Sequence, residues 1–416
     1  MATKKSAPVK VKSVKKASKP IAEKMEGGPD LDRAIKLVLE LMAIPGKSGE
    51  EKGISEAIRK HLIAAGAKPS QIRSDEVYKK SPLPNGACGN LVLDLPGTIP
   101  GPRRMLMAHL DTVPICVGCK PQREGEYVRS AKADTGLGAD NRTGCAVLLT
   151  TAREILTRKL PHGPLTFCWF VQEEVGLNGS RYVDKKFLAN PTMAFNWDGG
   201  PASKMTIGAT GGYRMTIDVH GIASHAGVAP EWGVSAIAIA GVAIADLHHR
   251  SWHGAVHKAG QHGTSNVGVI QGGDATNVVT DRVMLRAEAR SHDKDFREKI
   301  VQEIEAAFTR AAATVRNSSG ACGSVDIKGR LDYEAFKLAD DSPVILEAEK
   351  VIQSLGLDPV RAISNGGLDA NWTSAHGIPT VTMGAGQMNP HMVTETLDLS
   401  QFRLACQIAL KLATGR

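Results

Sequence analysis

The sequence has 416 residues, of which 42% are hydrophobic and 23% are charged, a balance typical of a folded globular protein with a sizeable core. The formal net charge of +8 does not indicate a nucleic-acid-binding fold, because +7 of it comes from residues 1–24, where eight lysines stand against Glu23. The most apolar stretch, residues 234–245, is too short to span a bilayer, so no membrane anchor is expected.

Residues 1–27 are predicted to form a disordered Lys-rich tail, since this segment is too polar to bury a core. The tail lacks the apolar region of a secretory signal. The seven cysteines are scattered and odd in number, and we expect them to be reduced thiols. Cys116 and Cys119 form a C-x-x-C pair, but no second pair follows at zinc-ribbon spacing. A cytoplasmic protein is therefore expected.

Ordered structure is expected from about Asp30. Apolar residues at helical spacing over 35–42 predict a first helix that Pro45 stops. Ser48, with Glu51 three residues later, predicts a capping box that begins a second helix ending near Gly66. Short apolar runs then predict strands buried on both faces of a mostly parallel sheet, with helices on both sides. These runs are residues 90–95, 105–110, 165–171, 193–197 and 378–383.

A different pattern interrupts these runs. Residues 213–219 alternate between apolar and polar, and a helix is predicted from Val234, followed by strands at 266–270 and 283–289 and a helix at about 296–313. This order resembles a small ferredoxin-like insert. The sequence thus predicts an α/β domain made of residues 28–208 and 332–416, with an inserted α+β lid domain at 209–331.

Histidine and acidic side chains follow several of the predicted strands, where open α/β sheets place their sites. His109 and Asp111 close the second run, and in an extended chain residues i and i+2 lie on the same face. Asp111 can therefore hydrogen-bond the far nitrogen of His109 and fix its tautomer. Taken alone, an H-x-D pair is more often a coincidence.

Two adjacent acids, Glu173 and Glu174, end another apolar strand, and both would be costly to leave charged near the core without a cation. One of them can bind a metal while the other acts as a general base on bound water. Asp198 ends the strand at 193–197, and His391 lies in the loop after the last strand. Asp140 lies in a glycine-rich loop before a helix, where an Asp on its own is more often an N-cap. Jointly, these imidazoles and carboxylates predict a metal centre of the kind that catalytic zinc takes.

The motifs HLDTVP at 109–114, GADN at 138–141, EEVG at 173–176 and NWDG at 196–199, with the late His391, resemble the di-zinc exopeptidase family. Its members include peptidase T, carboxypeptidase G and succinyl-diaminopimelate desuccinylase. The segments GIASHAG at 221–227 and GGDATNVV at 272–279 look most like the peptidase T-like branch. The resemblance covers nearly everything from residue 30 onward.

This resemblance implies two zinc ions per chain, or cobalt or manganese in their place, bridged by Asp140. His109 and Asp198 would complete one site, and Glu174 and His391 the other. Glu173 would deprotonate the bridging water and later protonate the leaving amine.

The resemblance also implies roles for residues outside the metal centre. His225 of the lid would donate to the tetrahedral oxyanion, in this family often across a dimer interface. Asn277 and Arg290 match positions that hold the carboxylate or backbone of a substrate, although Arg290 could also be a solvated surface charge. Gly366 and Gly367 lie in a segment, 365–369, that resembles the glycine-rich substrate loop.

Two features depart from the family pattern. The segment ICVGC at 115–119 is unusual after the H-x-D motif. The lid also carries a histidine cluster, in which His249, His253 and His257 fall at i, i+4 and i+8 and could share a helix face. No nearby acid or cysteine completes an accessory metal site there, so we favour a solvent-facing helix end and loop.

The sequence therefore predicts a cytoplasmic zinc exopeptidase that acts on short peptides, most like a tripeptide aminopeptidase, and that forms a homodimer through its lid. A carboxypeptidase or N-acyl-amino-acid amidohydrolase with the same di-zinc centre is the alternative within the fold. A non-catalytic peptide-binding protein is a more distant alternative, and Glu173 argues against it because a pure binder needs no general base. A further alternative is a protein that binds nucleic acid through its basic tail.

Overall fold

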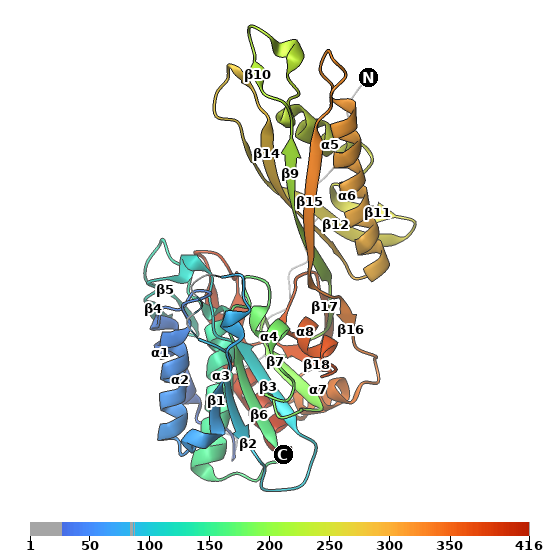
Figure 1. Cartoon of the computed structure of the whole chain (residues 1–416). Helices are drawn as coiled ribbons and strands as arrows, with labels where there is room; N and C mark the ends of the chain where they lie inside the picture. Colours follow the sequence, from blue (N-terminus) through green and yellow to red (C-terminus); the bar gives the residue numbers. More distant parts are fainter. Residues whose placement is uncertain (1–26, 84–85, 87, 416) are drawn as a thin grey trace, which may run out of the picture.

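The computed structural model describes residues 27–83, 86 and 88–415. The chain forms two parts, which we call the body (residues 27–210 and 334–415) and the lid (residues 211–333), and the lid extends from one end of the body (Figure 1). The tail expected at residues 1–27 lies, except for Gly27, outside the described residues. No helix in the described ranges has the length and apolar character needed to cross a membrane.

The body is built on a large sheet whose centre is parallel. The pairs β6–β3, β3–β7 and β7–β18 are parallel, and the neighbouring pairs at the edges are antiparallel apart from β17, which adds to β8 in parallel. In spatial order the strands are β1 (Ile72–Ser74), β2 (Leu91–Leu95), β6 (Leu165–Phe170), β3 (Arg104–His109), β7 (Met193–Trp197), β18 (Thr380–Met383), β8 (Lys204–Ala209) and β16 (Phe336–Lys337), with β17 (Val360–Ser364) on β8. The expected largely parallel sheet is confirmed, and each apolar run named above contributes a strand to it.

Alternate residues of these strands enter two different cores, as the period-2 geometry of a strand requires. Leu91 and Leu93 pack into the larger core on one face, whereas Val92 packs into a smaller one on the other. Val183, Phe187, Leu188 and Ile378 complete the smaller core. The larger core also receives buried residues of the helices α1 (Leu31–Ala43), α2 (Lys52–Ala64), α3 (Ala139–Arg158), α7 (Pro343–Ser354) and α9 (Leu399–Thr414).

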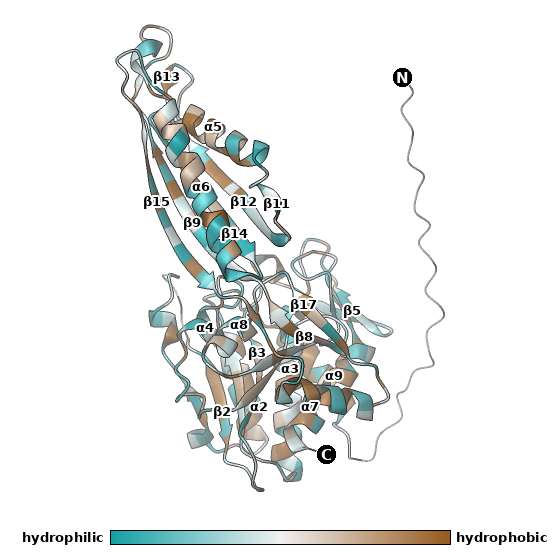
Figure 2. Cartoon of the chain, turned by 90° about the vertical axis from the view of Figure 1, so that its right-hand side faces the viewer, coloured by the Kyte–Doolittle hydropathy of each residue, from teal (hydrophilic) through white to brown (hydrophobic). Residues whose placement is uncertain are grey.

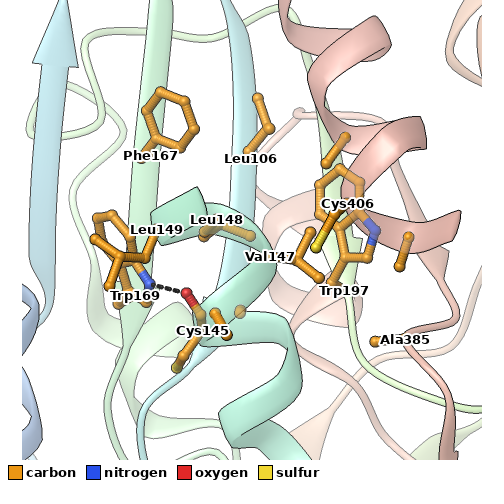
Figure 3. Packing of buried hydrophobic residues seen from close by; sticks show 14 of the residues in the cluster. Leu106, Cys145, Val147, Leu148, Leu149, Phe167, Trp169, Trp197, Ala385 and Cys406 are labelled. Carbon is orange, nitrogen blue, oxygen red and sulfur yellow. Dashed lines mark hydrogen bonds between the residues drawn. The ribbon is translucent and has the colours of Figure 1, made fainter. Parts of the chain in front are cut away.

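Helix α3 lies at the centre of the larger core, between the sheet and α9. Its residues 145–149 pack against Phe167 and Trp169 of β6, Trp197 of β7 and Cys406 of α9 (Figure 3). The indole Nε1 of Trp169 donates to the Cys145 carbonyl at 3.4 Å. Burying the large aromatic residues of β6 and β7 here fixes the N-terminal end of α3 over the ends of the same strands.

The lid is a ferredoxin-like sheet with two helices on one face (Figure 2). Its strand order β12–β14–β9–β15, all antiparallel, is that of the ferredoxin-like fold, with β11 added at the edge. Met215, Ile217 and Val219 point toward the helices, while the alternate residues face away from them. The elements are β9 (Gly211–His220), α5 (Ala236–His249), β11 (Gly254–Lys258), β12 (Gln261–Gly272), β14 (Arg282–Ser291), α6 (Lys294–Thr314) and β15 (Ser324–Tyr333), with β10 (Ser224–His225) paired to β13 (Val278–Val279).

The predicted start of the second helix is wrong. Helix α2 begins at Lys52, and no side chain caps it. The Ser48 hydroxyl instead donates to Asp111 Oδ2 at 2.7 Å, and Glu51 Oε1 accepts the backbone N–H groups of Gly49 and Gln172. Ser48 and Glu51 thus bond to residues distant in the sequence and do not form a capping box. The spacing of the two residues in the sequence cannot reveal such partners.

Helix α8 (Asp369–Ala375) fastens the two segments that join body and lid. The side-chain amide of Asn371 donates to the carbonyls of Thr210, at 3.0 Å, and Glu334, at 2.8 Å. The neighbouring indole of Trp372 donates to the Asp332 carbonyl at 3.0 Å. The outgoing and incoming chain segments are therefore held side by side by one helix.

The remaining elements of the body lie beside the carboxyl end of the sheet or bridge its edges. They are the small sheet β19 (Gln387–Met388), β20 (Thr396–Asp398), β5 (Tyr127–Ser130) and β4 (Pro121–Glu124), and the short helix α4 (Asn178–Tyr182). Single 3₁₀ turns occur at Pro69–Gln71, Val77–Lys79, Pro114–Cys116 and, in the lid, Pro230–Trp232.

The lid histidines do not share a helix face. His249 ends α5, and His257 lies on β11 facing His262 across the hairpin to β12. His249, His257 and His262 are exposed, as expected, but His257 and His262 lie on paired strands and not in a loop. All seven cysteines are free in the structure, and Cys116 and Cys119 are buried.

Candidate active site

The predicted ligands meet at one end of the large sheet. His109 is the last residue of β3, Asp198 follows β7, and Glu174 comes four residues after the end of β6. Because β6, β3 and β7 run parallel, their carboxyl ends lie at the same edge. Asp140 joins them from the start of α3, and His391 from the loop between β19 and β20.

Asp140 lies between the two histidines. Its Oδ1 is 3.1 Å from His109 Nε2, and its Oδ2 is 3.4 Å from His391 Nε2. His391 Nε2 also lies 3.0 Å from Glu174 Oε1. Ligand atoms of His109, Asp140 and Glu174 all fall within 4.8 Å of one another. One carboxylate thus presents a separate oxygen to each imidazole, which is the arrangement that a residue shared by two ions requires.

The surroundings of the acids in this cluster oppose their ionisation. Burial, together with the charges of Glu174 and Asp198, raises the pKa of Glu173 well above its usual range. Burial, and then the charge of Asp140, raises the pKa of Asp198 to about 8, and burial also raises that of Glu174. The raised pKa values of these three neighbouring carboxyls indicate that the site has too little positive charge to compensate them.

The histidines show the complementary effect. Hydrogen bonds to Asp140 and Glu174 raise the pKa of His391 to about 10. Burial opposes a charge on His109, yet contacts with Asp111 and Asp140 raise its pKa well above the ordinary value. The same two imidazoles lower the pKa of Asp140 although burial opposes this. The acidic surroundings of both histidines thus favour positive charge at this site.

The donor set fits a transition metal. Two imidazoles and three carboxylates converge from strand ends and loops, with Asp140 common to both halves of the set. Nitrogen and carboxylate oxygen are ligands that catalytic zinc, cobalt and manganese accept. A cation here would compensate the buried acids, whose desolvation is otherwise unfavourable.

Asp111 is wholly buried beneath the cluster. Its Oδ1 accepts the backbone N–H of Glu173 at 3.0 Å, and its Oδ2 accepts that of Glu174 at 3.2 Å. His109 Nδ1 lies 3.2 Å from the Asp111 carbonyl and 3.4 Å from its carboxylate. Asp111 therefore fixes the imidazole of His109 and the turn that carries the two glutamates.

Two buried polar residues near the cluster were not singled out from the sequence. Gln387 and Glu395 flank His391 at four residues on either side, and both make hydrogen bonds to the loop of Asp140. Glu395 is 1% exposed and Gln387 5% exposed. Their equal spacing from His391 points to a role in the site only once the fold is known. The neighbouring sequence does not show that either side chain is buried.

The lid residues are not brought to this cluster. His225, on β10, and Asn277, next to β13, lie together at the end of the lid farthest from the body (Figure 1). The Ala226 N–H donates to the Asn277 carbonyl at 2.9 Å, and His225 Nδ1 accepts the N–H groups of Gly227 and Val228. Both His225 and Asn277 are exposed. In this structure neither of them lies near the predicted metal ligands of its own chain (Figure 1).

Arg290 is partly buried on β14 and is not a solvated surface charge. Its guanidinium forms two hydrogen bonds with Glu288, at 2.9 and 3.0 Å. Gly366 and Gly367 lie between β17 and α8, and a Cβ on Gly367 would approach the ring of Tyr333 to 2.5 Å. The loop ends at buried Asp369, whose charge helps raise the pKa of Glu173 and Asp198. The end of the glycine loop therefore lies close to the acidic cluster.

Comparisons with known proteins agree with this geometry. Residues 207–316 match the peptidase dimerisation domain, and residues 90–220 match peptidase family M28. The uncharacterized protein YqjE of Bacillus subtilis is 30% identical over 370 residues, which cover 89% of this chain and 94% of that protein.

Two solved structures are similar along nearly the whole chain. A tripeptidase from Staphylococcus aureus is 30% identical with a TM-score of 0.81, and covers 92% of this chain and 98% of its own. The aminopeptidase PepT from Bacillus cereus is 29% identical with a TM-score of 0.79 and the same coverage. The chain therefore belongs to the exopeptidase family that includes peptidase T, and it is a metallopeptidase.

Proposed function

We propose that this metallopeptidase is a zinc-dependent aminopeptidase that releases the N-terminal residue of short peptides, tripeptides above all. His109 and Asp198 would hold one zinc ion, Glu174 and His391 would hold the second, and Asp140 would contribute to both. The observation that carries this proposal is the position of Asp140, whose two oxygens face His109 and His391 separately. Cobalt or manganese could replace zinc in the same donor set.

When bound, two such ions lower the pKa of water and polarise the scissile carbonyl. The chain supplies the proton transfers. Glu173 takes a proton from the attacking water and returns it to the nitrogen of the leaving amine, so that the carboxyl ends as it began. Its carboxyl is buried beside the charges of Glu174 and Asp198, within the cluster where these proton transfers take place. Asp111 holds the Glu173 backbone and His109 in place for this reaction.

The lid serves a second copy of the chain in this proposal. His225 and Asn277 lie too far from the metal ligands of their own body, so we place them in the active site of a partner, where His225 donates to the oxyanion. Arg290 and the loop with Gly366 and Gly367 hold the substrate. The match to a dimerisation domain supports a homodimer.

Exposed apolar residues on the lid support the same arrangement. Helix α5 exposes Ile237 and Val242, which are 49% and 43% exposed, on its outer surface. Trp232, close to His225 in the chain, is 57% exposed. Large apolar side chains open to solvent are typical of surfaces that pack against another protein. We also propose a cytoplasmic location, which the seven free cysteines favour.

Metal analysis combined with a substrate panel tests the proposed function. The purified protein should contain about two zinc, cobalt or manganese ions per chain. It should cleave free tripeptides faster than dipeptides, and it should not cleave N-acetylated tripeptides. Faster cleavage of N-acylated amino acids, or release of the C-terminal residue, would instead identify an amidohydrolase or a carboxypeptidase. Absence of any transition metal in active protein would refute the proposed centre.

A further inference from the structure

The loop that carries His391 is anchored at both of its ends by buried polar side chains. It connects β19 and β20, with Gln387 at its start and Glu395 just before β20. The side chain of His391 is 51% exposed, and its φ of 63° is a left-handed conformation that is uncommon for residues other than glycine. Such a residue keeps its place only when the surrounding structure holds it there.

Glu395 connects this loop to the loop of Asp140. Its Oε2 accepts the Gly138 N–H at 2.6 Å, and its Oε1 accepts the Asp140 N–H at 2.9 Å. The Cys116 thiol lies 3.7 Å from Oε2 and completes its surroundings. Both carboxylate oxygens of Glu395 thus accept hydrogen bonds from the backbone around Asp140, which is 255 residues away in the sequence.

Gln387 connects three loops. Its Nε2 donates to the Ala139 carbonyl at 2.9 Å and to Asn141 Oδ1 at 3.0 Å, on either side of Asp140. Its Oε1 accepts the N–H of Gly199, the residue after Asp198. One amide therefore fixes the Asp140 loop relative to the Asp198 loop.

We infer that Gln387 and Glu395 are positioning residues that set the spacing of the two metal sites: Glu395 through Asp140 and His391, and Gln387 through Asp140 and Asp198. This inference rests on the proposed metal centre. Neither side chain reaches a predicted ligand atom in the described structure, so each acts through backbone and loop contacts. Outer groups that orient ligands in this way typically change metal affinity 10–100-fold.

The two residues should affect different ions. His109 and Asp198 stay on their strand ends when Glu395 changes, so Glu395→Gln should weaken the ion held by His391 and Glu174. The amide of Gln at position 395 would direct its own N–H group toward the backbone N–H of Gly138 or Asp140, and two donors cannot form a hydrogen bond. Gln387→Leu frees Gly199 and should mainly weaken the ion held by His109 and Asp198. Each variant should raise the dissociation constant of its own ion about 10–100-fold. The dissociation constant of the other ion should rise by a smaller factor, because Asp140 contributes to both sites.

Stepwise titration of metal-free protein with Co²⁺, followed by its visible spectrum, measures both affinities. The variants His391→Ala and Asp198→Ala assign each step to a site, and Val393→Ala, an exposed change in the same loop, is the matched control. At saturating metal, kcat should fall while KM stays near the wild-type value. Thermal unfolding of the metal-free variants separates this effect from general loss of structure, and Glu395→Asp provides a second variant should Glu395→Gln fail to fold.

The outcomes separate this inference from the proposed function. Wild-type protein that takes up fewer than two Co²⁺ ions overturns the proposed centre and this inference with it. Wild-type protein with two ions, and variants that bind both as tightly, overturns this inference alone. Equal weakening of the two ions by each variant, with a matching loss of thermal stability, indicates a merely structural role and also overturns it.

Discussion

The imidazole Nε2 of His391 lies 3.0 Å from Oε1 of Glu174, although 217 residues separate the two in the sequence. Glu174 comes from the central part of the sheet, and His391 comes from a loop that follows the last strand of the sheet. This contact shows that one half of the proposed metal centre exists only when the C-terminal segment has packed onto the rest of the body.

Metal removal should destabilise the fold. Without a cation, Glu173, Glu174 and Asp198 remain buried beside one another, and their burial opposes ionisation. Zinc at about 100 times its dissociation constant should add about 2.7 kcal/mol per site to the free energy of unfolding. Thermal denaturation of chelated protein, with zinc or with magnesium added back, measures this. An unchanged melting temperature after verified removal of metal would contradict the prediction.

The adjacent glutamates should separate chemistry from metal binding. Glu173→Gln removes the proposed base and should lower kcat by about two to four orders of magnitude while metal content stays at the wild-type level. Glu174→Gln should lower metal affinity as well as rate, because Glu174 contacts His391. Steady-state kinetics with elemental analysis of both variants gives the comparison. Near-normal turnover in Glu173→Gln would remove Glu173 from the role of base.

Metal affinity should increase with pH. In the metal-free chain, Asp140 and Glu174 raise the pKa of His391 to about 10, so this imidazole carries a proton at neutral pH that a metal must displace. The raised pKa means that the charged His391 contributes stability to the metal-free fold fully below its unfolded value of about 6.5 and loses it as pH rises toward about 10.

Zinc titrations at about pH 6 and about pH 8 should both release the His391 proton, because both values lie below about 10, and binding should be tighter at the higher pH. His391→Ala is the control, because it removes the proton concerned. Binding that is independent of pH in the wild type would contradict the assignment of His391 as a ligand.

His225→Ala should retain metal and fold, yet lower turnover about a hundredfold or more, as loss of one oxyanion donor does elsewhere. Because His225 lies at the tip of the lid, mixing His225→Ala with inactive Glu173→Gln protein should restore part of the activity. Each mixed dimer then contains one site with both groups intact. No recovery, although subunit exchange is demonstrated, would place the action of His225 within its own chain.

Much of the body could be predicted because its strands are apolar runs of ordinary length, and the ligands directly follow them. His109, Glu174 and Asp198 could be singled out on that basis, since strand ends are where a parallel sheet places polar groups. Ser48 and Glu51 misled the prediction because their spacing fits a capping box, whereas buried Asp111 and the N–H of Gln172 are their actual partners.

Other parts of the site depend on contacts that no local pattern encodes. Gln387 and Glu395 look like loop residues in the sequence, and only their packing against the Asp140 loop makes them buried acceptors and donors. The distance of His225 from the metal ligands also depends on how far the lid extends from the body (Figure 1). Neither the burial of Gln387 and Glu395 nor the distance of His225 from the ligands can be predicted from the spacing of residues in the sequence.

The position of β18 has a consequence for the order of folding. This strand lies between β7 and β8, so the body keeps a gap in its main sheet until residue 383 has been synthesised. The lid, by contrast, pairs β9, β14 and β15 within residues 211–333, so its sheet does not depend on any strand made after it. A nascent chain that stalls before β18 therefore leaves one edge of β7 and one edge of β8 unpaired, and unpaired strand edges favour aggregation.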